Sequence, residues 1–99
     1  MKGWRQVVDQ TEYDIYETEN ESCIEVVTTN ITFSSTNTWA TYDGLTIPVN
    51  YRPITHLPMA SSNPNVNVRL TTTGQVQLYK TTSGSTTVGC HLNYFRRKM

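Results

Sequence analysis

The sequence predicts an all-β fold, a small antiparallel β-sandwich or jelly-roll-like domain of about seven or eight strands. Three observations lead to this prediction. Apolar residues recur at every second position in several short runs, glycine turns separate those runs, and helical periodicity never extends beyond one turn. Because 99 residues is the size of one domain, we expect a single β domain over residues 1–99.

The first expected strands lie in the N-terminal half. Residues Thr11–Thr18 form a candidate strand with Tyr13 and Ile15 on one side. Asn20 and Glu21 then mark a turn, since short polar side chains favour turn conformations.

A second strand is expected over Ser22–Phe33. Here Ile24 and Val26 lie on one face, whereas Val27, Ile31 and Phe33 lie on the other. Apolar residues on both faces indicate either burial on both sides or a β-bulge.

Shorter elements follow in the middle of the chain. Ser34–Asn37 is a polar loop, and Trp39–Asp43 is a short run that ends at the turn signal Asp43-Gly44. Three prolines between Pro48 and Pro58 predict an edge strand followed by irregular chain, because proline cannot donate a hydrogen bond to a neighbouring strand.

The clearest alternation lies in the second half of the chain. Val66–Leu70, Gln75–Lys80 and Thr86–Phe95 each place apolar residues at every second position. We expect these three runs to form a β-meander over about residues 66–95.

Two turns of the form Thr-x-Gly set the expected register. A three-residue loop at 72–74 places Leu70 opposite Val76, and the same geometry at 82–84 places Val76 opposite Cys90. A slip by one residue would divide the apolar residues between the core and water. The expected pairs also include Val68 with Leu78 and Leu78 with Val88, so the predicted core is Val66, Val68, Leu70, Val76, Leu78, Val88, Cys90 and Leu92.

Apolar residues are few for a chain of this length. Val, Ile, Leu and Phe make up 21 of the 99 residues, whereas Ser, Thr and Asn make up 32. A domain this small buries only a little over roughly 60% of its unfolded surface, which leaves its stability marginal. We therefore expect an oligomer to supply the missing apolar burial.

Charge is balanced in sum but not in position. Seven of the eight acidic residues lie between Asp9 and Glu25, whereas Arg96, Arg97 and Lys98 lie at the C-terminus. The acidic and basic regions are either two solvated edges or interacting surfaces. In the second case they pair with each other, within one chain or across a subunit boundary, or one of them docks on a larger partner. A neutral chain with an acidic front is not expected to bind nucleic acid.

Cysteine usage and hydropathy point to no covalent framework and no membrane insertion. Cys90 is expected to face inward, and both it and Cys23 are expected to be free thiols. The alternative is a disulfide between them, which requires the first half of the chain to bring the strand of Cys23 alongside. No apolar run approaches the roughly 20 residues that a membrane span needs. Lys2 and Arg5 are followed by polar and acidic residues, so no signal peptide is expected.

No catalytic motif is present, so we expect no enzyme, no cofactor and no metal. His56 and His91 are the general-base candidates near neutral pH, and neither belongs to a nucleophile or metal motif. The acidic run from Glu17 to Glu25 is interpreted as a solvated strand edge rather than a glycosidase pair or calcium loop.

A saccharide site is the best candidate for binding, because sugars require aromatic rings beside hydrogen-bonding groups. Trp39, Tyr42 and Asp43 provide that mixture in one short segment, and His56 adds a polar group in a later loop. Alternatively, Trp39 anchors the core or an interface.

The order of the elements in the second half resembles a known family. Pro48 and the turn Tyr51-Arg52-Pro53 precede a Val-x-Val-x-Leu strand, a Thr-Gly turn, a Val-x-Leu strand and a last strand closing on Tyr94. This pattern, over about residues 45–94, resembles the C-terminal head domains of bacteriophage tail-fibre and baseplate proteins, especially those of phages that infect Gram-positive bacteria. Trp4 is similar in position to a tryptophan near the start of such domains.

The resemblance implies a homotrimeric virion protein of the tail or baseplate, made in the cytoplasm of the bacterial host. Such a protein would bind a bacterial cell-wall polysaccharide in host attachment or dock another virion protein. A virion assembly module and a non-viral carbohydrate-binding module are the alternatives.

Overall fold

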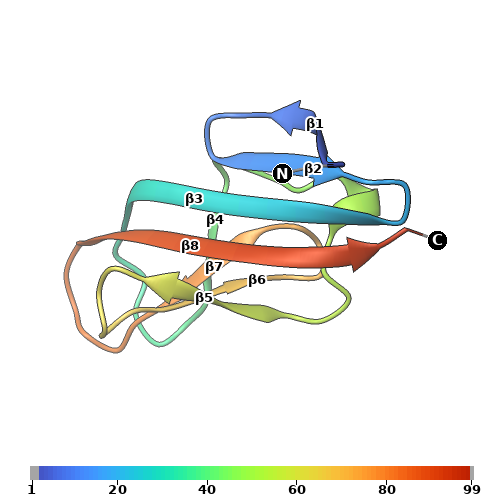
Figure 1. The fold of residues 1–99 in the computed structure, drawn as a ribbon. Helices are drawn as coiled ribbons and strands as arrows, with labels where there is room; N and C mark the ends of the chain where they lie inside the picture. The colour runs from blue at the N-terminus through green and yellow to red at the C-terminus, as the bar shows by residue number, and fades with distance from the viewer. Residues whose placement is uncertain (1–2, 99) are drawn as a thin grey trace.

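The computed structural model describes residues 3–98, and in that range it contains eight β-strands, one 3₁₀ turn and no α-helix (Figure 1). All paired strands are antiparallel, and their order in the sheet is β1-β2-β3-β8-β5-β6-β7-β4. The prediction of an all-β antiparallel fold with about seven or eight strands is therefore confirmed. The elements are β1 (Arg5–Asp9), β2 (Tyr13–Glu17), β3 (Glu21–Phe33), β4 (Ala40–Tyr42), the 3₁₀ turn η1 (Val49–Tyr51), β5 (Leu57–Ser61), β6 (Asn67–Leu70), β7 (Val76–Tyr79) and β8 (Thr86–Arg97).

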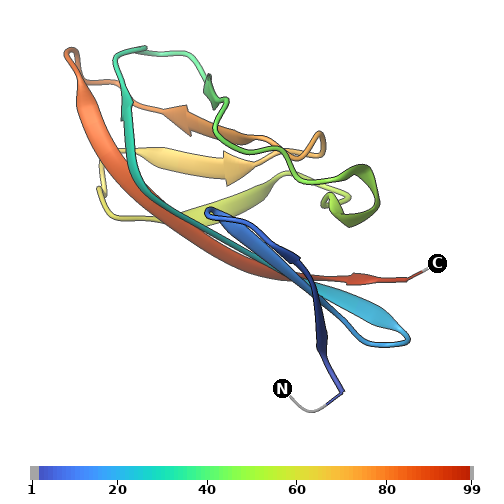
Figure 2. The ribbon, with the colours of Figure 1, turned by 90° about the horizontal axis from the view of Figure 1, so that it is seen from above.

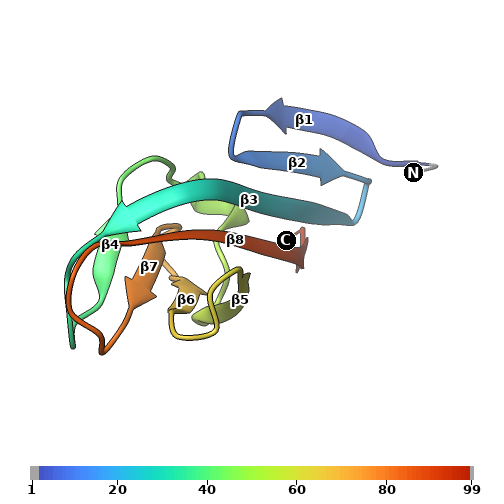
Figure 3. The same ribbon diagram turned by 90° about the vertical axis from the view of Figure 1, so that its left-hand side faces the viewer.

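Strand β5 joins two layers of one curled sheet. Its first residues pair with β6, through Leu57↔Leu70 and Met59↔Val68, whereas Ala60 pairs with His91 of β8. Figures 2 and 3 show the consequence: β5, β6 and β7 turn under the long β3–β8 ladder. A strand that changes partner part-way is a common way to turn a corner between two layers.

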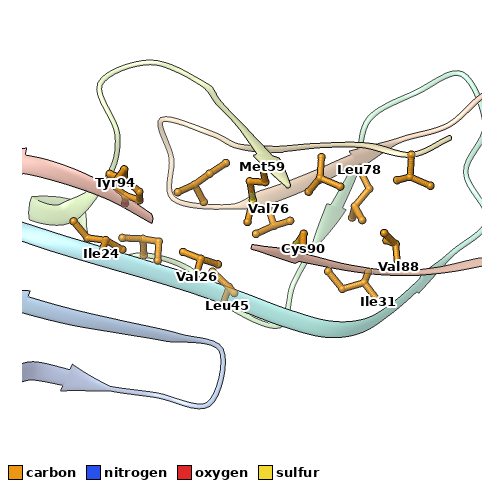
Figure 4. Packing of buried hydrophobic residues seen from close by; sticks show 14 of the residues in the cluster. Ile24, Val26, Ile31, Leu45, Met59, Val76, Leu78, Val88, Cys90 and Tyr94 are labelled. Carbon is orange, nitrogen blue, oxygen red and sulfur yellow. The ribbon is translucent and has the colours of Figure 1, made fainter. Parts of the chain in front are cut away.

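The hydrophobic core fills the space between these layers. Figure 4 shows side chains from β3 and β8 meeting those from β5 and β7. Seven of the eight predicted core residues are buried, and the eighth, Leu92, is partly buried and packs against the same cluster. The N-terminal half contributes Ile15, Ile24, Val26, Ile31, Leu45 and Ile47, β5 contributes Met59, and β8 also contributes Tyr94.

The β6–β7 hairpin has the predicted register. Leu70 pairs with Val76, and Val68 pairs with Leu78. Between the two strands the Thr71 N–H donates to the Gln75 carbonyl oxygen at 2.9 Å, which leaves residues 72–74 as a three-residue loop. Gly74 in this loop has a φ of 80°, in the left-handed region that favours glycine.

The meander prediction is wrong at its last strand. Strand β8 does not follow β7 in the sheet, because β7 pairs with β4 on that side and β8 pairs with β3 and β5. Val88 consequently lies opposite Ile31 rather than Leu78, and Cys90 opposite Thr28. Alternation fixes which face of a strand is buried but not which strand is its neighbour, so the predicted core remained correct.

A buried lysine accounts for the path of the chain between β7 and β8. Lys80 is 1% exposed, and its Nζ donates to the carbonyl oxygens of Thr82 and Gly84, each at 2.7 Å, and of Ser34 at 3.4 Å. Residues 80–84 therefore wrap around an ammonium group instead of forming a tight hairpin, and the chain crosses to the other layer.

Strand β3 contains the bulge that its sequence indicated. Thr28 pairs with Cys90 and Ile31 with Val88, so β3 has one more residue than β8 over this interval. The extra residue turns Ile31 inward with Val26, whereas Val27 is 42% exposed. Alternation without a bulge would have placed Ile31 on the same outer face as Val27.

The proline-rich segment departs from the prediction. Instead of an edge strand followed by irregular chain, it forms η1 and then β5, which lies between β8 and β6. Pro58 is tolerated there because it pairs with Arg69 of β6 before β8 joins the other side of β5 at Ala60. Strand β1 (Arg5–Asp9) was not predicted.

Both cysteines are free, as expected, and Cys90 is buried as expected; Cys23 is buried as well. Cys23 lies opposite Phe95, whereas Cys90 lies opposite Thr28 at another point of the β3–β8 ladder. In the part of the chain that the structure describes, no helix is long and apolar enough to cross a membrane.

Candidate functional site

The outer face of β4, β6 and β7 carries a cluster of aromatic and polar side chains, here called the Trp39 platform: Trp39, Arg69, Gln77 and Tyr79. The strand register places them together, because Arg69 lies opposite Gln77 and Gln77 opposite Thr41. Their neighbours Val68, Leu78 and Val76 are buried, so the alternating positions face outward.

The aromatic part of the platform consists of two rings and a guanidinium. The rings of Trp39 and Tyr79 have centroids 5.4 Å apart and are tilted by 45°. Arg69 Cζ lies 3.9 Å from the centroid of the Trp39 ring, a cation–π distance. All three side chains are partly buried, so parts of the rings reach solvent.

Hydrogen bonds fix the polar part. Arg69 Nε and Nη2 both donate to Gln77 Oε1, at 2.9 and 2.7 Å. Gln77 Nε2 in turn donates to Thr41 Oγ1 at 3.3 Å. A guanidinium has donors beyond these two, so Arg69 Nη1 can serve a ligand without loss of the contacts that hold the side chain.

A hollow of about 330 Å³ adjoins the platform. Trp39, Arg69, Asn67 and His56 contribute to its lining, and the base includes Met59 of the core. His56 is exposed, and its Nδ1 accepts a hydrogen bond from the Thr72 N–H at 3.3 Å. The volume is at the lower end of the range of about 300–1,000 Å³ for small-molecule sites.

The structure thus brings together two of the four predicted site residues, Trp39 and His56. Tyr42 points the other way, because it pairs with the buried Val76. Its hydroxyl donates to the Glu12 carboxylate, at 2.7 and 2.8 Å to the two oxygens, and this bond raises the pKa of Tyr42 to about 12. Asp43 is exposed in the turn after β4, outside the hollow.

Arg69, Gln77 and Asn67 were missed in the sequence, although a signal for them was present. The predicted register set Val68 opposite Leu78, and the residues that alternate with this pair must face outward together. The same alternation places Trp39 and Tyr42 on opposite faces of the sheet, because an odd number of positions separates them in the sequence.

A second polar cluster ties the Tyr-Arg-Pro turn to the end of the sheet. Glu17 accepts hydrogen bonds from Lys98 Nζ, at 2.6 Å, and from the Tyr51 hydroxyl. The bonds from Lys98 and Tyr51 hold the pKa of Glu17 below its ordinary value of 4.5. The Tyr94 hydroxyl donates to the Tyr51 carbonyl at 2.6 Å. These groups satisfy one another, so the cluster stabilises the fold rather than offering free groups to a ligand.

The Glu17–Lys98 ion pair shows that the acidic strands and the basic C-terminus pair at one point. One residue of the acidic N-terminal strands pairs with one of the basic tail within a single chain. Elsewhere the acidic residues face each other: Asp9 lies opposite Asp14, and Asp14 opposite Glu25. Burial and the neighbouring Asp9 raise the pKa of Asp14 above 3.8. Among residues 3–98, no group of three or more His, Cys, Asp or Glu side chains could hold a metal ion.

Comparison with protein families, with curated proteins and with solved structures finds no match to this chain. The fold and the Trp39 platform are therefore interpreted from the residues themselves.

Proposed function

We propose that this chain is a non-enzymatic tip protein of a bacteriophage tail or baseplate that acts in host attachment by binding a cell-surface saccharide at the Trp39 platform. The saccharide proposal rests on one observation: Trp39, Asn67 and the hydrogen-bonded guanidinium of Arg69 line the same hollow. The phage context rests on the resemblance of residues 45–94 to tail-fibre and baseplate heads. A homotrimer would supply the apolar burial that the composition lacks.

The platform offers both kinds of contact that a sugar needs. The exposed parts of the Trp39 and Tyr79 rings provide apolar surface for sugar C–H groups. The Asn67 amide, the His56 imidazole and the free donor of Arg69 provide hydrogen bonds for hydroxyl or acidic groups. A bacterial cell-wall polysaccharide combines these features.

A second candidate function is a virion assembly module that docks another phage protein. Ile54 and Phe95, which are 80% and 60% exposed, favour this alternative because they line an apolar groove that shares no lining residue with the hollow at the platform. A non-viral carbohydrate-binding module would use the Trp39 platform in the same way, but as a monomer with affinity for soluble glycans.

Binding to whole Gram-positive cells and to their purified wall polysaccharide, together with light scattering, distinguishes these functions. We expect Trp39→Ala to weaken binding about tenfold or more, because it removes both the ring and the surface on which Arg69 rests. Tyr42→Phe is the matched control, since its hydroxyl points inward to Glu12. Equal binding by Trp39→Ala and the wild type would place the site elsewhere. Binding to a virion protein and to no cell or glycan would favour the assembly module.

A further inference from the structure

An apolar groove of about 390 Å³ runs between the end of β8 and the chain that follows η1. Its apolar walls include Ile54, Leu57 and Phe95, and Arg96 and Arg97 lie along its side. Ile54 and Phe95 are both strongly exposed, at 80% and 60%. Apolar side chains this exposed and this close together commonly mark an interaction surface.

The groove follows an unpaired strand edge. Strand β5 pairs with β8 only at Ala60↔His91 and Ser61↔Cys90. From residue 92 to residue 97, β8 pairs with β3 on one side, and no strand of residues 3–98 covers the other side. An open edge beside an apolar groove can accept an extended segment, since the backbone supplies hydrogen bonds and the groove receives side chains.

The same chain contains a segment with complementary properties. Strand β1 is the outermost strand at the other end of this layer, so its outer edge is also open. On the β1–β2 hairpin, Asp9 lies directly opposite Asp14, and Glu25 of β3 extends the row. Like charges in such positions are destabilising, and no salt bridge to these carboxylates occurs within residues 3–98. Val7 adds an apolar side chain that is 37% exposed.

One molecule cannot join these two surfaces. Strands β2 and β3 lie between β1 and β8, so the hairpin and the groove are on opposite sides of the β3–β8 ladder (Figures 1 and 2). A contact between them therefore requires a neighbouring molecule.

We propose that the groove beside residues 92–97 of β8 binds the acidic β1–β2 hairpin of a second copy of this chain. Val7 of the hairpin packs against Ile54 and Phe95, and the carboxylate of Asp9 approaches Arg97, whose guanidinium forms no salt bridge within residues 3–98. The contact joins two different surfaces, so it is head-to-tail, and repetition around an axis closes a ring. A homotrimer would be one such ring.

This inference rests on the oligomer in the proposed function but not on its ligand. Neither Ile54 nor Asp9 contributes to the hollow at the Trp39 platform. Saccharide binding per chain is therefore expected to remain unchanged when the interface is broken, although avidity on whole cells falls.

Light scattering on two single variants and their mixture tests the contact. Ile54→Asp places a carboxylate in the groove, and Asp9→Lys reverses a charge on the hairpin; both residues are exposed, so circular dichroism should show an intact fold. We expect each variant alone to associate about tenfold more weakly or worse than the wild type. Their equimolar mixture should form a heterodimer, because Ile54→Asp keeps its hairpin and Asp9→Lys keeps its groove.

Thr46→Asp and Asp43→Lys are the matched controls. Thr46 is exposed and lines neither the groove nor the neighbouring hollow that includes Arg97, and Asp43 is an exposed acid outside the hairpin. Both should associate like the wild type. A monomeric wild type would overturn the interface and the assembly together. Oligomers that survive Ile54→Asp and Asp9→Lys would overturn this interface alone, and a mixture that stays monomeric would show that the contact is not head-to-tail.

Discussion

Arg69 and Trp39 are coupled across the outer face of the sheet. The guanidinium carbon lies 3.9 Å from the centroid of the indole ring, and two hydrogen bonds to Gln77 Oε1 hold the guanidinium in place. The ring and the cation thus form one preorganised surface, and a ligand meets this surface without having to order either side chain.

The first prediction is that Arg69→Lys weakens saccharide binding several-fold while changing the free energy of unfolding by less than about 1 kcal/mol. A lysine cannot reproduce the forked contact with Gln77, and it lacks the planar group that covers the indole. Calorimetric titration with purified wall polysaccharide measures the affinity. Arg97→Lys, outside the platform, is the control and should leave the affinity unchanged. Both substitutions keep the positive charge, so equal losses in the two variants would show that the forked contact of Arg69 with Gln77 does not account for the affinity.

The second prediction concerns Lys80. Replacement by methionine keeps the apolar stem but leaves the carbonyl oxygens of Thr82 and Gly84 without the donor that they now share at 2.7 Å. Because the Lys80 side chain is 1% exposed and its ammonium donates to both oxygens, we expect Lys80→Met to lower the free energy of unfolding by about 1–3 kcal/mol. Urea denaturation measures this loss.

Lys98→Met is the comparison for Lys80→Met. Lys98 is 40% exposed, so water screens its ion pair with the 10% exposed Glu17, and a solvent-screened pair contributes about 1 kcal/mol or less. If both substitutions cost the same, the ammonium of Lys80 does not organise the loop between β7 and β8.

The sequence predicted which face of each strand is buried better than it predicted which strands pair with each other. The period of two in β6, β7 and β8 identified the buried residues, and the glycine at position 74 fixed the β6–β7 register. The strand that pairs with β8 is the one that forms the more stable ladder with it. Strand β3 is far longer than β7 and therefore forms more backbone hydrogen bonds with β8. Alternation within β8 contains no information about that competition.

The candidate site was predicted in part for the same reason. Trp39 and His56 were recognised by residue type, but Tyr42 was grouped with Trp39 although β4 turns the two to opposite faces. Arg69 and Gln77 became neighbours through pairing between strands, and residue type alone did not single them out. Strand register decides which side chains meet on the outer face of a sheet. A predicted register therefore predicts clusters on the exposed face as well as pairs in the core.

The third prediction is a pH dependence of stability. Hydrogen bonds from Lys98 and Tyr51 lower the pKa of Glu17 below 4.5. A carboxyl whose pKa is lower in the folded state stabilises the fold above its unfolded pKa, and this stabilisation is lost as the pH falls through the folded value. We expect thermal stability to fall below about pH 4.5, and to fall less in Glu17→Gln. Parallel curves for the two proteins from pH 7 to pH 3 would contradict this role of Glu17.

The last prediction compares two glycines that share a backbone conformation but differ in their surroundings. Gly74 and Gly84 have φ angles of 80° and 89°, so alanine is strained at both, at a cost of about 1–2 kcal/mol. At Gly84 an added Cβ would meet nothing within 4 Å, whereas at Gly74 it would lie 2.6 Å from the Ile47 carbonyl oxygen.

That oxygen cannot move freely, because Ile47 O accepts a hydrogen bond from Arg52 Nε and Ile47 N–H donates to Gly74 O, each at 2.8 Å. Gly74→Ala must therefore either break these bonds or open the β6–β7 turn. We expect Gly74→Ala to cost about 2 kcal/mol more than Gly84→Ala in urea denaturation, because only the first adds a backbone clash to the strain. Equal costs would mean that the chain before η1 does not pack against the turn as closely as the 2.6 Å approach requires.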